Sequence, residues 1–147
     1  MTDLDVTGRD CLSLTVSGDW AHFRRIDTTN DKQTYAVMPR TTVAGLLAAI
    51  IGEPRDSYYQ EFTRESSAIA VVPVTPLRTM QVPMLTVPTT EGDIQTAEGT
   101  TGKTVVSPDV LEEKRQRRTF EYVRSPTYRI HVVLENENWM ERLTNRL

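Results

Sequence analysis

The chain has 147 residues, of which 38% are hydrophobic and 25% are charged, a balance typical of a soluble globular domain and not of a disordered protein. No apolar run reaches the ~20 residues that span a bilayer, and residues 1–10 lack the apolar segment of a signal peptide. The one cysteine, Cys11, cannot form an internal disulfide, and we expect it to be a buried, inert thiol. We therefore expect a cytoplasmic protein.

The net charge of −3 is unevenly distributed along the chain. Residues 1–102 carry a net −5, residues 103–129 carry +3, and residues 130–147 carry −1. An acidic body with one basic segment is typical of a local contact with phosphates, not of a protein that coats nucleic acid over its whole surface.

The first predicted elements are a strand and a loop. From Cys11 to Val16 apolar and polar side chains alternate, which is the period of a half-buried strand. Residues 27–33 are rich in Asp, Thr and Asn, and this composition predicts a loop.

A helix at residues 43–51 is the clearest element of the sequence. Its large apolar side chains recur at helical spacing and predict one buried stripe of Val43, Leu46, Leu47, Ile50 and Ile51. We expect Thr41 or Thr42 to supply the N-cap hydroxyl and Gly52 to end the helix. The opposite side carries small residues that would let another backbone approach closely, namely Ala44, Gly45, Ala48 and Ala49.

The middle of the chain predicts a strand followed by a long hairpin. Residues 56–65 indicate a short helix or an irregular connection, and residues 68–74 indicate a strand. Residues 77–87 and 114–123 are expected to be the two arms of the hairpin, with the polar segment 88–104 at its tip.

A final strand and helix complete the predicted fold. The strand covers residues 128–134, and the helix begins at residue 136 with apolar positions four apart at Trp139, Leu143 and Leu147. The order strand, helix, strand, strand, helix is the α+β, ferredoxin-like plan without its last strand. We therefore expect one domain over residues 1–147 that is truncated relative to its relatives or is completed by a partner.

Patterns for catalysis are weak. Residues 97–104 match a relaxed P-loop expression, but the polar residues before them cannot form the buried strand that a P-loop requires, and Pro108 would break the helix after it. His22, His131 and the single cysteine have no spacing typical of a zinc site. We expect no cofactor and no metal, and we place His131 on the polar face of its strand.

The segment from Ser17 to Arg25 is the first candidate for binding. Rings stack on unpaired bases and guanidinium groups hold phosphates, and this segment contains two aromatic residues, a histidine and two arginines: Trp20, Phe23, His22, Arg24 and Arg25. The alternative interpretation places Trp20 and Phe23 in the core and leaves the arginines in solvent.

Two further segments carry groups suited to phosphates. The backbone amides of residues 39–42, together with Arg40, would form a phosphate seat at the start of the helix, unless this is an ordinary capped helix. The densest basic cluster would contact a nucleic-acid backbone from an exposed hairpin, or would be merely solvated, and it consists of Lys114, Arg115, Arg117 and Arg118.

The order of residues in these segments resembles the Cas-five family, the CRISPR-associated Cascade subunits of type I systems in the RAMP superfamily. The resemblance is to the type I-B branch and rests on residues 17–25, 34–35 and 39–50. Residues 118–132 resemble the stretch that follows the thumb hairpin of the family, so the similarity spans about residues 11–135.

The resemblance implies an RRM-like RAMP body with a protruding β-hairpin thumb, here at about residues 77–124. It implies a non-catalytic subunit that binds the 5′ handle of CRISPR RNA (crRNA) and contacts the backbone subunit and the large subunit of Cascade. Carried over to this sequence, the residues near the handle would be Trp20, His22, Arg24, Arg25, Arg40 and Thr41. The thumb would present Lys114, Arg115, Arg117 and Arg118.

The sequence departs from the family pattern in two respects. Relatives continue past residue 147, so the last strand and the glycine-rich part of the handle site are not in this sequence. The type I-C branch cleaves crRNA without metal by using Tyr, Lys and His side chains, but here Arg115, and not a histidine, follows Lys114. The alternative to a non-catalytic subunit is an endoribonuclease that uses His22 with Tyr35 or Lys114.

Overall fold

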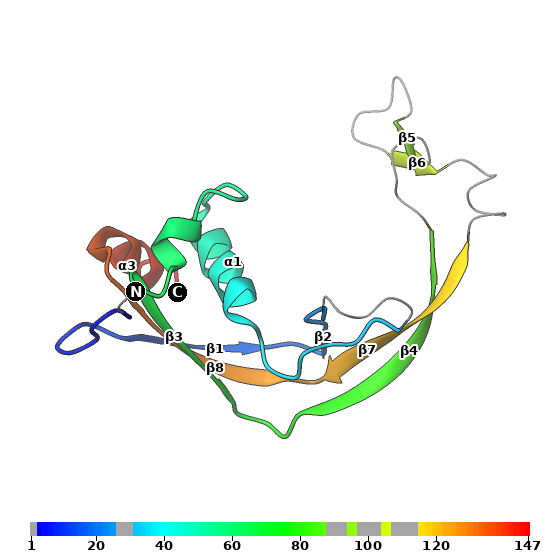
Figure 1. Cartoon of the computed structure of the whole chain (residues 1–147), viewed down its shortest axis with the longest axis horizontal. Helices are drawn as coiled ribbons and strands as arrows, with labels where there is room; N and C mark the ends of the chain where they lie inside the picture. The colour runs from blue at the N-terminus through cyan, green and yellow to red at the C-terminus, as the bar shows by residue number, and fades with distance from the viewer. Residues whose placement is uncertain (1–2, 26–30, 88–93, 97–103, 107–114) are drawn as a thin grey trace.

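Two antiparallel three-stranded sheets follow one another along a curved path, and the helices lie over the first of them (Figure 1). The computed structural model describes residues 3–25, 31–87, 94–96, 104–106 and 115–147. None of the helices in these ranges is long and apolar enough to cross a membrane.

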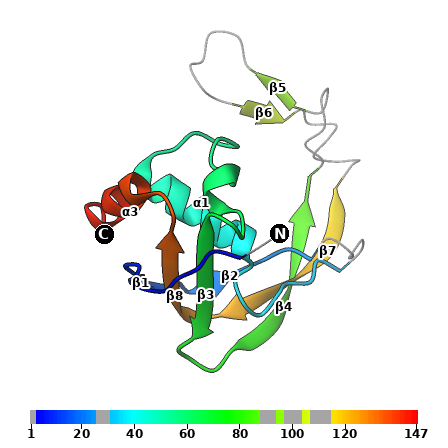
Figure 2. The ribbon, with the colours of Figure 1, turned by 60° about the vertical axis from the view of Figure 1, so that its left-hand side comes forward.

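The first sheet has the strand order β1–β8–β3, with β1 at Leu12–Ser17, β8 at Thr127–Leu134 and β3 at Ser67–Pro73. Helices α1 (Arg40–Ile51) and α3 (Glu137–Thr144) cover one face of this sheet (Figures 1 and 2). Both outer strands are antiparallel to β8, as the ferredoxin-like plan requires, and the predicted α+β fold is confirmed. Within the described ranges, β1 pairs with β8 alone.

The core forms where β8 meets the helices. Alternate residues of β8 point to one face and are almost fully buried: Tyr128, Ile130, Val132 and Leu134. Leu143 of α3 packs into the same cluster, and each such large apolar side chain contributes about 1.5–3 kcal/mol on burial. The Tyr128 hydroxyl donates a 2.5 Å hydrogen bond to the Ala36 carbonyl, which ties the segment before α1 to the sheet.

The buried face of α1 differs from the predicted stripe. Leu46 and Ile50 are only half-buried, whereas Ala44 and Ala48 are buried beside the fully buried larger residues of the helix. The small-residue side therefore faces the core in part. At Gly45 an added Cβ would lie 3.1 Å from the Tyr58 hydroxyl, so an aromatic side chain, and not another backbone, approaches the helix there.

The two ends of α1 gave one wrong and one correct prediction. Pro39 occupies the N-cap position, and no side chain caps the helix, so neither Thr41 nor Thr42 supplies the expected hydroxyl. The Pro39 carbonyl instead accepts hydrogen bonds from the amides of Thr42 and Val43. Gly52 ends the helix in the left-handed conformation at φ 81°, as expected for a glycine C-cap.

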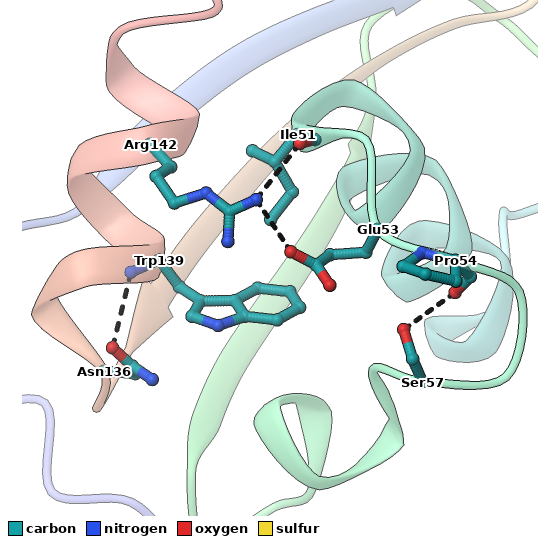
Figure 3. A network of polar contacts seen from close by, with 7 residues as sticks. All are labelled: Ile51, Glu53, Pro54, Ser57, Asn136, Trp139 and Arg142. Carbon is teal, nitrogen blue, oxygen red and sulfur yellow. Dashed lines mark hydrogen bonds and ion pairs between the residues drawn. The ribbon is translucent and has the colours of Figure 1, made fainter.

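An arginine of α3 fastens this helix to the end of α1 (Figure 3). Arg142 Nη2 lies 2.7 Å from a carboxylate oxygen of Glu53 and donates to the Ile51 carbonyl at 3.2 Å. The Asn136 side chain caps α3 by accepting from the Trp139 amide. Leu147, predicted to share the apolar face of this helix, lies beyond it and is exposed.

The second sheet has the order β2–β7–β4 and contains the predicted hairpin arms. Strands β4 (Arg78–Thr86) and β7 (Gln116–Arg124) pair in register over nine residues each, and the short strand β2 (Trp20–Ala21) lies on the other side of β7. Strand β7 passes into β8 after Ser125, which has φ 45°, so one stretch of chain runs through both sheets. The arms extend away from the helices (Figure 1).

The remaining elements are short. A 3-10 helix, η1, covers Tyr59–Phe62 within the predicted connection, and β5 (Ile94–Thr96) pairs with β6 (Thr104–Val106). The P-loop match lies outside the described residues except for Thr104. Cys11 is exposed and not buried, because it precedes β1 and falls on the outward side of the alternation.

Candidate nucleic-acid interface

One face of the second sheet carries rings, thioethers and cations in cross-strand rows. Pairing in an antiparallel sheet puts registered residues on the same face, so the register itself identifies this surface. We call it the arm face and define it by the registered residues Trp20, Arg78, Met80, Val82, Met84, Arg118, Phe120, Tyr122 and Arg124.

The rows of the arm face alternate in chemistry along β7. Trp20 and Arg78 flank Arg124 in the first row, and Met80 lies opposite Tyr122 in the next. The third row pairs Phe120 with Val82, and the fourth pairs Arg118 with Met84. The described residues of these rows include no acidic side chain.

The aromatic side chains of this face contact one another. The Trp20 and Tyr122 ring centroids lie 6.3 Å apart at an interplanar angle of 79°, and Phe120 stacks on Tyr122 at 6.3 Å. Trp20 is nevertheless 51% exposed, whereas Phe23 belongs to the core. The core interpretation drawn from the sequence therefore holds for Phe23, which anchors the segment, but not for Trp20, which presents its ring to solvent.

The imidazole ring of His22 packs against two rings of the arm face. Its Nδ1 donates a 2.7 Å hydrogen bond to the Glu121 carbonyl, which can only accept, so Nδ1 carries the proton. Its ring lies 5.7 Å from Phe120 and 5.4 Å from Tyr122. The Nε2 atom is buried and has no hydrogen-bond partner among the described residues. His22 is thus held as a packing residue in this arrangement.

Lys32 lies near basic residues of two segments that the sequence analysis considered separately, Arg24 and Arg118. It bridges to Phe120, and its backbone exchanges 2.8 Å hydrogen bonds with the Thr119 carbonyl and the Glu121 amide. Burial lowers the pKa of the Lys32 ammonium group, and the nearby positive charges of Arg24 and Arg118 lower it further. Three cations therefore gather at one end of the arm face, although Arg24 and Arg118 are far apart in the sequence.

An open pocket of about 380 Å³ lies beside this cation cluster, which we define as Arg24, Lys32 and Arg118. The pocket is lined by Asp31, Gln116, Arg117, Arg118 and Thr119. Arg118 Nη2 donates to the Gln116 side-chain oxygen at 2.6 Å, which orients the guanidinium group without neutralising it. A neutral partner leaves the charge of Arg118 available to an anion.

Residues 31–35 are attached to β7 through Glu121. Its carboxylate accepts a 3.1 Å hydrogen bond from the Thr34 amide, and Thr34 bridges to Arg24. Arg25 lies with its guanidinium carbon 5.7 Å from the centroid of the Tyr35 ring, in cation–π geometry. These contacts set where Arg24 and Arg25 stand relative to the sheet.

The guanidinium group of Arg40 is engaged by protein acceptors. Its Nη2 donates to the carbonyls of Phe62, Thr63 and Ser67 at 3.2, 2.9 and 2.8 Å, and to the Ser67 hydroxyl at 2.6 Å. Its Nε also donates to the Phe62 carbonyl at 3.3 Å. Partial burial lowers its pKa, and Arg64 adds to the effect. The guanidinium group therefore fastens α1 to η1 and β3, while Thr41 is exposed in the first turn.

The basic run near residue 115 is divided by the strand that contains it. Arg118 lies on the arm face, but Arg117 pairs with Leu85 on the opposite face, and Arg115 precedes β7 and is exposed. Lys114 lies outside the described residues. Among the described residues of this run, Arg118 is the one that lies on the arm face.

Sequence reasoning missed several residues of this surface. They are Lys32, Arg78, Met80, Tyr122 and Arg124, and each lies in a region that was interpreted only as loop or strand. The signal was present as period-two alternation in both hairpin arms, Arg78-Met80-Val82-Met84 against Arg118-Phe120-Tyr122-Arg124.

The fold and the arm face together define an α+β protein of ferredoxin-like plan with a cationic, aromatic sheet surface. A family model described as CRISPR-associated protein (Cas_Cas5) matches residues 11–147. The chain belongs to this Cas5 family, as the resemblance indicated.

Solved structures show the same fold. A chain of a "CRISPR RNA-guided surveillance complex" matches with a TM-score of 0.58 and 14% sequence identity over 93% of this chain. The match covers 54% of that chain, so the present chain spans about half of its length. No curated protein matches the sequence.

Proposed function

We propose that this protein is a non-catalytic RNA-binding subunit of a type I CRISPR interference (Cascade) complex. It binds the 5′ handle of crRNA and contacts the backbone subunit and the large subunit of the complex in the cytoplasm. The family membership supports the setting, and the arm face supports the RNA-binding role.

The observation that carries the proposal is the combination on the arm face of cations with one exposed ring, Trp20, and two half-buried rings, Phe120 and Tyr122. Single-stranded nucleic acid is bound by aromatic side chains that stack on bases and by cations that follow the phosphates. Trp20, Tyr122 and Phe120 offer the rings, and the cation cluster lies beside them. The opposite face of the same strands buries Val123 and contains Glu121, so it suits a polyanion less well.

The non-catalytic part of the proposal rests on the arrangement of His22. A general base must reach the ribose hydroxyl that it deprotonates, within about 3 Å. Nδ1 of His22 is occupied by a backbone carbonyl, and Nε2 is buried among rings. Incubating the protein with repeat RNA in EDTA tests this point, and site-specific cleavage that disappears in His22→Ala would support the endoribonuclease alternative.

Salt-dependent binding tests the RNA-binding role. Affinity for fluorescently labelled handle RNA is measured by anisotropy over a series of salt concentrations, for the native protein and for the Arg24→Ala, Arg118→Ala double variant. Each lost phosphate contact lowers the slope of log K against log salt by about 0.7 for a single strand, so the slope should fall by about 1.4.

Arg55→Ala is the matched control for this experiment. Arg55 is exposed on the loop after α1, where it lies beside Asp56. Its removal changes the net charge in the same direction but should leave the slope unchanged. Equal slopes for the native protein and the double variant would refute the assignment of RNA to this face.

A further inference from the structure

We propose that single-stranded RNA crosses the arm face parallel to β7, with an unpaired base stacked on Trp20 and phosphates held at both ends of the face. The inference rests on the proposed function and adds the direction of the RNA, its length and the residue that stacks. Arg78 and Arg124 hold one end, and Arg24 and Arg118 hold the other.

The exposure of Trp20 is the first observation behind this inference. An indole at 51% exposure leaves much of a large apolar ring in water, which a core role does not explain. Among the described residues its ring contacts Tyr122, and the 79° angle makes this an edge-to-face contact that does not sandwich the indole. Trp20 thus provides a supported stacking platform beside the exposed Arg124.

The spacing of the cations is the second observation. Arg118 and Arg124 lie on the same face of β7, six residues apart, and a strand rises ~3.3 Å per residue, so they are separated by about 20 Å along the strand. Stacked nucleotides rise ~3.4 Å each, and about six of them would span this distance. Phe120 and Tyr122 fill the interval between the two ends. The face therefore has cations at its ends and rings in its middle.

The alternative occupant is a protein. Exposed tryptophan and methionine side chains, such as Trp20, Met80 and Met84, also occur at protein interfaces. The rows of the arm face, however, contain Arg78, Arg118 and Arg124 and, among the described residues, no acidic side chain. This charge distribution favours a polyanion.

The test uses the full chain and oligouridylates of two, four, six and eight nucleotides. Anisotropy with labelled RNA should show affinity that increases with length up to about six nucleotides and then levels off. Trp20→Ala should weaken binding of the six-nucleotide RNA about tenfold without changing the salt slope, because a stacked base is lost but no phosphate contact is. Tyr59→Ala, which removes another exposed ring at η1, should leave binding unchanged.

Trp20 fluorescence gives a second, independent readout. In a Trp139→Phe background Trp20 is the remaining tryptophan, and RNA should quench its emission. If Trp139→Phe does not fold, the anisotropy of Trp20→Ala in the native background decides the question.

The outcomes separate this inference from the proposed function. RNA binding with unchanged affinity in Trp20→Ala, or binding of the dinucleotide as tight as that of the octamer, would overturn the inference and leave the RNA-binding role standing. Loss of partner subunits in Trp20→Ala with full RNA affinity would assign the ring to a protein contact instead. A native protein that binds no RNA would refute both.

Discussion

Replacing Arg40 by alanine should destabilise the protein without weakening its affinity for RNA. Arg40 donates to three backbone carbonyls and one hydroxyl, which lie between the last residue of η1 and the first residue of β3. A hydrogen bond from a charged donor contributes about 1.5–3 kcal/mol. The Thr63 carbonyl would still accept from the amide and the hydroxyl of Ser67 in the variant, which reduces the loss. We therefore expect a net loss of about 3 kcal/mol.

This loss corresponds to a clear change in thermal unfolding. For a chain of this size 1 kcal/mol shifts the Tm by about 2–4 °C, so Arg40→Ala should lower the Tm by about 6–12 °C. Circular dichroism measures the shift, and RNA anisotropy at a temperature where both proteins are folded measures binding. Arg40→Lys should recover only part of the stability, because an ammonium group cannot reproduce the planar donor arrangement.

The opposite result would restore the interpretation drawn from the sequence. If Arg40→Ala has the same Tm as the native protein but binds RNA with lower affinity and a smaller salt dependence, then Arg40 is a phosphate ligand at the start of α1. The structural assignment of its guanidinium group would then be wrong.

Two further substitutions test other parts of the structure. Arg142→Ala removes the ion pair with Glu53 and the hydrogen bond to the Ile51 carbonyl. Because Arg142 is partly exposed, we expect the free energy of unfolding, measured with denaturant, to fall by about 1 kcal/mol. Arg146→Ala, which lies outside this network, should change the free energy of unfolding little. Lys32→Met tests the lowered pKa of Lys32. A lysine whose pKa is lower in the folded state binds fewer protons there than in the unfolded state, so the stability of the native protein should rise as the pH approaches 10.5, the ordinary pKa of lysine. The stability difference between the native protein and Lys32→Met, followed by Tm against pH, should change in that alkaline range, and a pH-independent difference would contradict the assignment.

The elements of this fold could be predicted because each one has a local signal. The apolar period predicted α1, alternation predicted β1, and the bounds predicted for β3, β4, β7 and β8 agree with the structure to within about two residues. The orientation of α1 could not be read in the same way. The Tyr58 hydroxyl lies against Gly45, and Ala44 and Ala48 share the buried face; such tertiary contacts are not specified by the local sequence.

The candidate site was only partly predictable for a similar reason. Trp20 and Arg24 stand in a dense local motif, but Arg78 and Arg124 become neighbours only through the register of β4 with β7. Arg40 looked like a ligand because a helix start and a cation often bind phosphate, and its protein acceptors come from residues more than twenty positions away. Non-local acceptors leave no mark on local sequence.

Glu121 provides a test in which electrostatics and positioning predict opposite results. Removing a carboxylate near a polyanion site should strengthen RNA binding if long-range charge dominates. However, Glu121 accepts from the Thr34 amide through its side chain, and its backbone joins both His22 and Lys32. The side-chain contact helps to hold Arg24 and Lys32 beside Arg118.

We expect positioning to dominate in this case. Without the carboxylate, residues 31–35 lose the charge-assisted hydrogen bond that orders them, which contributes ~1.4 kcal/mol. Because RNA binding must then order these residues, Glu121→Ala should bind RNA about tenfold more weakly. Glu121→Gln retains an oxygen that can accept from Thr34 while losing the negative charge, so it should bind at least as tightly as the native protein. Anisotropy at low salt distinguishes the two variants. If both strengthen binding equally, then the connection between Glu121 and residues 31–35 does not position the cation cluster, and the charge of the arm face alone determines affinity.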